Sequence, residues 1–226
     1  ICFEQISELA AIRLEDEPVW DGQAKSSRYQ NFATSSWFVP GTIRGQEIEA
    51  SYLGILRGLA TVYRALHDPL SQFLTEREPR PEIMTPAAYQ RAITARAFDV
   101  TRYLLPLAAQ TNVGQVVSIR TLEKQITRLL SSQIPELRQI GEDLQEACRK
   151  PPVNLWGELS GQSAGLGEPM APTLARYAKP SVYQAEVYSD LARYAKEVLK
   201  GTGLDQASAY GAAEPVDLIE PHDPLD

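Results

Sequence analysis

The sequence predicts an α+β fold in which long helices pack on a small sheet. Over several long stretches of the 226-residue chain, apolar residues recur every three or four positions, which is typical of amphipathic helices. Two shorter stretches are rich in β-branched, serine, threonine or aromatic residues, which is typical of strands. Because 43% of the residues are hydrophobic, a chain of this length can bury a substantial core.

The N-terminal part of the chain is predicted to hold one helix and one strand. Residues 1–17 carry apolar side chains at helical spacing, and Pro18 ends that pattern. Asp21 and Gly22 are typical of a turn. Residues 26–39 are rich in serine, threonine and aromatic residues, so we expect extended chain that joins the sheet.

Two long helices are predicted next. An apolar stripe runs through residues 46–74, where Pro69 kinks or ends the helix. Thr85 followed by Pro86 is typical of an N-cap and the first helical residue. The second helix is therefore expected over about residues 86–105.

The rest of the chain is predicted to return to the sheet once and then to helices. The β-branched residues around Gly114 indicate a strand at 112–118, and apolar spacing indicates helices at 119–131 and 135–149. A Pro/Gly/Ser-rich stretch, 151–172, is typical of a loop or linker, and a helix is expected over 181–200.

These elements suggest one principal domain over residues 1–150. Residues 151–226 add a linker, a helix and an acidic tail that can lead into a further domain. Because the first residue is Ile1, we expect a fragment or a processed form, with a truncated N-terminus.

Composition excludes several classes of function. The net charge of −7 and the pI of about 5.0 argue against nucleic-acid binding. No apolar run is long enough to span a bilayer, so no membrane association is expected. Two cysteines and two histidines poorly supply a zinc site or a Ser–His–Asp triad, and we expect no metal and a reducing, cytoplasmic location.

One short motif carries groups that bind anions. Ser26, Ser27, Arg28 and Tyr29 are consecutive, and an extended backbone would place Ser26 and Arg28 on the same side. A hydroxyl and a guanidinium together can donate several hydrogen bonds to one phosphate. Taken alone, the motif is more typical of an exposed strand edge with ordinary polar residues.

The order of this motif and three later ones resembles the flavin-dependent thymidylate synthases. The resemblance covers about residues 1–150. The first matching element is a Ser-x-Arg-Tyr motif, Ser26–Tyr29, and the second is an Arg…Leu-Pro…Thr arrangement made by Arg102, Leu105, Pro106 and Thr111. The third is an arginine followed by a hydroxyl residue and leucine at the start of a helix, Arg120–Leu122. The fourth is a step similar to Glu-Ile-Arg, Glu136–Arg138.

The resemblance implies reductive methylation of dUMP to dTMP, with FAD as cofactor and methylenetetrahydrofolate and NADPH as co-substrates. It implies that the active site forms between the subunits of a homo-oligomer, a tetramer, or a dimer if a second similar domain follows. It assigns no catalytic side chain. It implies dUMP-binding residues Ser26, Arg28 and Arg120, and FAD-binding residues Arg13, Thr111 and Asn112.

The sequence also departs from the family pattern. Where the family has an Arg-His-Arg cluster that contacts the flavin, this chain has the acidic residues Glu15, Asp16 and Glu17, which would repel a pyrophosphate. An alternative is therefore a non-catalytic relative that keeps the fold for oligomer assembly or nucleotide binding. A third interpretation is a helical adaptor whose apolar stripes dock partners.

Arg120 has a structural alternative of its own. It can cap its helix, or pair with Glu123 or Glu136 on the surface, without binding any ligand.

Overall fold

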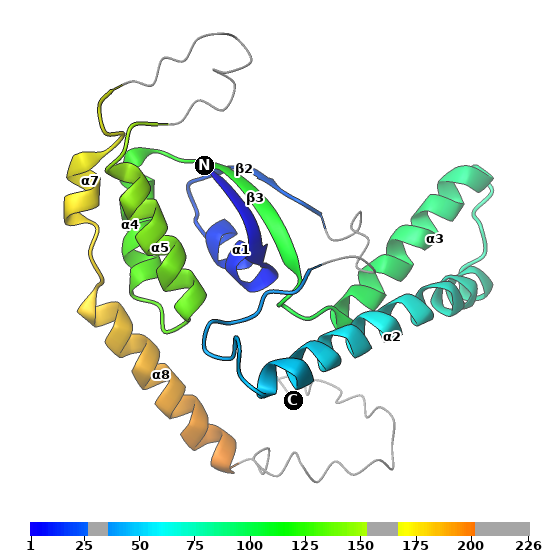
Figure 1. The fold of residues 1–226 in the computed structure, drawn as a ribbon. Helices are drawn as coiled ribbons and strands as arrows, with labels where there is room; N and C mark the ends of the chain where they lie inside the picture. Colours follow the sequence, from blue (N-terminus) through cyan, green and yellow to red (C-terminus); the bar gives the residue numbers. More distant parts are fainter. Residues whose placement is uncertain (27–35, 153–166, 202–226) are drawn as a thin grey trace, which may run out of the picture. The chain divides into compact units, whose positions relative to one another are not determined.

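The computed structural model describes residues 1–26, 36–152 and 167–201 (Figure 1). The chain divides into two compact units, Ile1–Pro180 and Ser181–Asp226. The first unit combines a three-stranded antiparallel sheet with long helices, which confirms the predicted α+β class.

The sheet has the order β1-β3-β2, with β3 (Gln110–Val116) in the centre. β1 (Cys2–Ser7) and β2 (Asp21–Ala24) each pair with it antiparallel. The central strand was predicted at 112–118 and begins two residues earlier. Its side chains alternate between the two faces of the sheet, and those of Thr111, Val113 and Gln115 are buried.

The prediction of one helix over residues 1–17 is wrong for its first half. Residues 2–7 form β1, and only α1 (Glu8–Glu15) is helical. The register of β1 shifts between Phe3 and Ile6, so both side chains are buried three positions apart. That spacing matches one turn of a helix, and the sequence pattern could not distinguish the two structures.

The N-terminal turn and the strand that was expected to follow it are also corrected. Asp21 and Gly22 begin β2 rather than a turn, since they pair with Val116 and Gln115 of β3. Of the predicted strand 26–39, residues 27–35 lie outside the described residues. Within the remainder, the backbone contact with the sheet edge is an isolated bridge between Trp37 and Ala109.

Two helices after the sheet match the prediction closely. α4 (Ile119–Leu130) and α5 (Pro135–Cys148) pack side by side (Figure 1). Ser118 caps α4 by accepting a hydrogen bond from the Thr121 N–H at 3.1 Å. Their buried faces join β1, α1 and β3 in one hydrophobic core, whose largest fully buried apolar side chains are Leu14, Ile126, Leu129, Val113 and Cys148.

A short helix that was not predicted begins at the last residue of the predicted linker, 151–172. α7 (Pro172–Tyr177) packs on α4 and α5, and its Leu174 and Ala175 are buried in the same core. Residues 153–166 lie outside the described part of the chain.

α2 (Ile48–Arg77) and α3 (Pro86–Thr101) form an antiparallel hairpin (Figure 1). Pro69 lies inside α2 and does not end it. Thr85 caps α3 as predicted, accepting a hydrogen bond from the Ala88 N–H at 3.3 Å. α3 ends at Thr101, four residues before its expected end, because a short 3₁₀ helix, η2 (Arg102–Leu104), follows.

In the second unit, α8 (Val182–Gly201) confirms the helix predicted at 181–200. Among the helices that the structure describes, none combines the length and the apolar character that crossing a membrane requires.

Candidate functional site

Ser26 lies just beyond the end of β2 and is exposed. The preceding Lys25 continues the pairing, since its N–H donates to the Asn112 carbonyl at 3.0 Å. Arg28, the central residue of the predicted phosphate site, lies outside the described residues.

Arg120 is the second residue of α4 and is exposed. Its guanidinium makes no hydrogen bond or ion pair within the described ranges, so the alternative pairing with Glu123 or Glu136 is not formed there. A cation in the first turn of a helix is disfavoured by the helix dipole by about 0.3–1 kcal/mol. Helix stability therefore does not explain why an arginine occupies this position of α4.

A single chain does not bring Ser26 and Arg120 together. Ser26 follows the end of β2 that pairs near Asn112, whereas Arg120 follows Val116 at the opposite end of β3. The four-residue step from Asn112 to Val116 alone spans about 13 Å.

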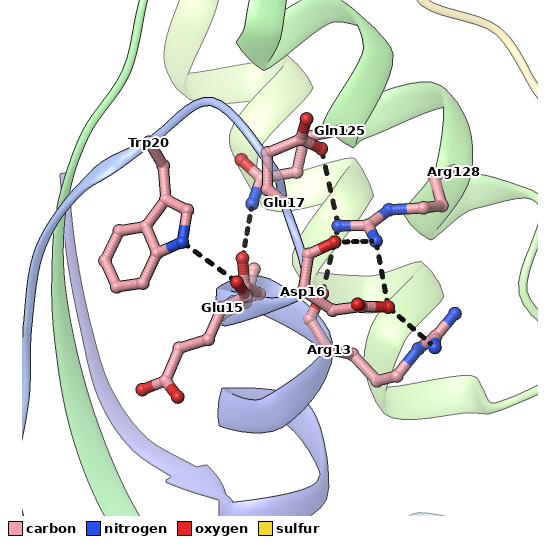
Figure 2. Close-up of polar contacts among 8 residues, drawn as sticks. Arg13, Glu15, Asp16, Glu17, Trp20, Gln125 and Arg128 are labelled. Carbon is pink, nitrogen blue, oxygen red and sulfur yellow. Dashed lines mark hydrogen bonds and ion pairs between the residues drawn. The ribbon is translucent and has the colours of Figure 1, made fainter.

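Arg13 belongs to a charged network at the end of α1 (Figure 2). Its Nη1 lies 3.2 Å from Oδ2 of Asp16. Arg128, projecting from α4, donates to the carbonyl oxygens of Asp16 and Arg13 at 2.9 and 3.0 Å. The same guanidinium lies 3.5 Å from carboxylate oxygens of both Asp16 and Glu17. The guanidinium groups of Arg13 and Arg128 therefore offset the negative charges of this acidic turn, and the Arg13 side chain has a partner within the chain.

The other two predicted flavin-binding residues also have internal partners. Thr111 is buried, and its hydroxyl donates to the Lys25 carbonyl at 3.4 Å. The side-chain oxygen of Asn112 accepts from the Gln5 N–H at 2.9 Å. Arg13, Thr111 and Asn112 therefore each have a partner within the chain.

Sequence analysis missed a pocket of about 650 Å³ beside the end of β1. Its walls come from the β1–α1 junction, residues 38–44, the first turns of α2, residues 107–108 and the start of α5. The lining is mainly apolar, and its polar members are Gln5, Ser7, Arg44, Tyr52, Glu136 and Gln139. These segments are far apart in the sequence and share no motif, so no sequence signal identified the pocket.

The acid in this pocket is held in place by a neighbouring strand. The Ser7 N–H donates to Oε1 of Glu136 at 2.8 Å, and the Ser7 hydroxyl donates to Oε2 at 2.5 Å. The Tyr52 hydroxyl donates to the Phe38 carbonyl at 3.1 Å. Burial, together with the negative charge of Glu136, raises the pKa of Tyr52.

A metal centre finds no support in the described residues, since none of their His, Cys, Asp and Glu side chains gather in a group of three. Cys2 and Cys148 are both free thiols, the first exposed and the second buried.

Comparison with known proteins identifies distant relatives. No family model matches the chain. The chain is 27% identical over 148 residues to a UPF0159 protein of Chlamydia muridarum, and 26% identical over 149 residues to one of Chlamydia pneumoniae. Each match covers 63% of this chain and 28% of the relative, so the chain spans little more than a quarter of their length.

Two crystal structures of thymidylate synthase X from Helicobacter pylori, both with FAD and dUMP, are also similar. The first is 16% identical with a TM-score of 0.35, covering 65% of this chain and 64% of the other. The second is 15% identical with a TM-score of 0.36, covering 72% and 70%. A TM-score below 0.5 does not establish a common fold.

Proposed function

We propose that this chain binds the phosphate of a pyrimidine nucleotide and acts as a flavin-dependent thymidylate synthase-like protein, methylating dUMP to dTMP. The supporting observation is Arg120, an exposed guanidinium in the first turn of α4 without a partner among the described residues. A bound phosphate dianion would offset the unfavourable position of this cation and would accept hydrogen bonds from N–H groups of the helix terminus.

The rest of the phosphate site would come from the Ser-x-Arg-Tyr motif. Ser26 and Arg28 would donate hydrogen bonds to the same phosphate oxygens, the guanidinium bidentately. Since Ser26 and Arg120 lie at opposite ends of β3, we propose that a second copy of the chain supplies one of the two. The functional form would then be a homo-oligomer, as the resemblance implies.

In an active enzyme, FAD reduced by NADPH would supply the hydride and methylenetetrahydrofolate the one-carbon unit. The contribution of the chain's own residues would be to bind and orient the nucleotide. The resemblance implies that Arg13, Thr111 and Asn112 would hold the FAD.

One observation favours the second candidate, a non-catalytic relative that binds the nucleotide without turnover. Asp16 and Glu17, in the place of the family's basic flavin contacts, are acidic and form ion pairs with Arg128. Such a protein would keep Arg120 and Ser26 but would not take up FAD.

Growth and absorbance separate the two candidates. The synthase would rescue a thymidine-requiring bacterial strain on medium without thymidine, and the purified chain would show flavin absorbance bands after FAD is added and free flavin removed. The non-catalytic relative would bind dUMP but would give neither growth nor bound flavin. Absence of dUMP binding, flavin uptake and rescue would refute the proposed function altogether.

A further inference from the structure

The pocket beside β1 has the size of a small-molecule site. Its volume, about 650 Å³, lies in the usual range for ligand pockets of roughly 300–1,000 Å³. Ile6, Leu9, Phe38, Leu107 and Ile140 contribute apolar walls. An apolar ligand of one or two rings would fit, and burying it would remove its apolar surface from water.

A bulge in β1 shapes one wall of this pocket. Gln5 has a φ of 57°, an unusual value for a residue other than glycine, and its N–H is held by the Asn112 side chain at 2.9 Å. The register shift between Phe3 and Ile6 lets both Ile6 and Ser7 be buried in succession. Bulges of this kind are frequent beside binding sites, because they redirect side chains.

The buried and partly buried polar groups of the pocket offer acceptors, whereas Gln5, Arg44 and Gln139, which also carry donors, are exposed. Ser7 gives both of its donors to Glu136, and Tyr52 gives its proton to the Phe38 carbonyl. The carboxylate and the phenol oxygen retain lone pairs, since a carboxylate can accept about four hydrogen bonds. Glu136 is only partly exposed and has no cationic partner in the part of the chain that the structure describes.

From this arrangement we propose that the pocket binds an apolar small molecule carrying a protonated amine, with the amine hydrogen-bonded to Glu136. The ammonium would bring a positive charge and donors to the Glu136 carboxylate, and charge-assisted hydrogen bonds are roughly twice as strong as neutral ones. The apolar part of the ligand would lie against the aliphatic and aromatic walls. This ligand is distinct from the proposed pyrimidine nucleotide, which is an anion.

The lining also contains a cation, Arg44. It is exposed, and its Nη2 donates to the Val39 carbonyl at 3.1 Å. Its charge is therefore screened by solvent and salt more effectively than that of the partly buried Glu136. The acid, rather than this arginine, should determine which ligand charge the pocket prefers.

Three probes of similar shape test the proposal: naphthylmethylamine, which is protonated at neutral pH, neutral naphthylmethanol and anionic naphthylacetate. Each is titrated into the full chain and followed by its fluorescence. We expect the amine to bind at least about tenfold more tightly than the alcohol. Glu136→Gln should remove this preference and leave binding of the alcohol within about threefold.

Glu142→Gln is the matched control, since Glu142 lies on the exposed side of α5 outside the pocket and its substitution removes the same charge. It should leave all three affinities unchanged. Leu107→Trp adds bulk to a half-exposed wall residue and should weaken both the amine and the alcohol, which keeps the test valid if Glu136→Gln folds poorly.

Three results would overturn the proposal. One is equal binding of the amine and the alcohol to the unmodified chain. Another is tightest binding by naphthylacetate, with loss of that binding on Arg44→Gln. The third is binding of the amine that neither Glu136→Gln nor Leu107→Trp reduces.

Discussion

At the scale of single residues, Arg128 connects α4 to the end of α1. Its side chain is 20% exposed, and it contacts two main-chain carbonyls and two carboxylates, including the nearly buried Glu17 (Figure 2). The last carbonyl groups of a helix have no intrahelical partners, so a guanidinium that donates to them stabilises the helix end.

Replacing Arg128 should therefore destabilise the protein. Arg128→Met keeps the apolar stem but removes the guanidinium contacts with the Glu17 carboxylate and with two carbonyl groups, and we expect a loss of about 2–3 kcal/mol in the free energy of unfolding. Arg149→Met is the control, because Arg149 is half exposed and its ion pair with Glu146 lies at the surface, where such pairs contribute little to stability. Urea denaturation measures both, and equal small losses would contradict this role for Arg128.

A second residue-scale prediction concerns alkaline pH. Burial raises the pKa of Tyr63, an effect that a hydrogen bond with Thr101 partly offsets. The unfolded chain, with tyrosine pKa near 10, therefore loses this proton at lower pH than the folded chain does. The stabilisation that comes from the raised pKa of Tyr63 is complete below the pKa of the unfolded chain. It is lost as pH rises through the pKa of the folded chain.

Urea denaturation at pH values on either side of 10 should show this loss. Tyr63→Phe should make stability fall less steeply above pH 10, by up to about 1.4 kcal/mol per pH unit. Tyr103→Phe, at a position that is 84% exposed, should follow the unmodified chain. Parallel curves for all three proteins would refute the prediction for Tyr63.

At the scale of elements, the close approach of β2 and β3 depends on Gly22. A Cβ atom there would lie 2.1 Å from the Gly114 carbonyl oxygen and 2.6 Å from the Trp20 ring. The backbone oxygen cannot move without breaking the strand pairing, so the two strands would have to separate.

Gly22→Ala should cost about 2–3 kcal/mol of stability, the usual cost of overpacking. Gly54→Ala is the matched control. Gly54 lies in α2, and no heavy atom lies within 4 Å of the Cβ it would gain. That substitution should stabilise the helix by about 0.5–1 kcal/mol. Thermal and urea unfolding measure the stability of both variants. An unchanged stability of Gly22→Ala would contradict the close contact between β2 and β3.

Elements with strong local signals could be predicted from the sequence, and those that depend on pairing could not. α4 and α5 have a clear apolar stripe, and Ser118 and Pro135 mark their first turns, so their bounds were predicted to within one residue. β1 was missed because its bulge places Phe3 and Ile6 at helical spacing. β2 is only four residues long and exists because β3 lies beside it.

At the scale of the whole molecule, the candidate sites depend on arrangements that no local pattern encodes. The sequence identified Ser26 and Arg120 by residue type and order, but not that they follow opposite ends of β3. It identified Arg13, Thr111 and Asn112 by resemblance, but not their internal partners. The pocket with Glu136 and Tyr52 was not predicted, because distant segments form it.

The central claim is that Arg120 contributes to a phosphate site, and calorimetric titration of dUMP into the full chain at low salt tests it most directly. We predict saturable binding that Arg120→Gln weakens at least about tenfold, as expected for loss of a charged hydrogen-bond donor, whereas Arg149→Gln leaves it unchanged. No saturable binding, or equal affinity for the unmodified chain and Arg120→Gln, would contradict the claim.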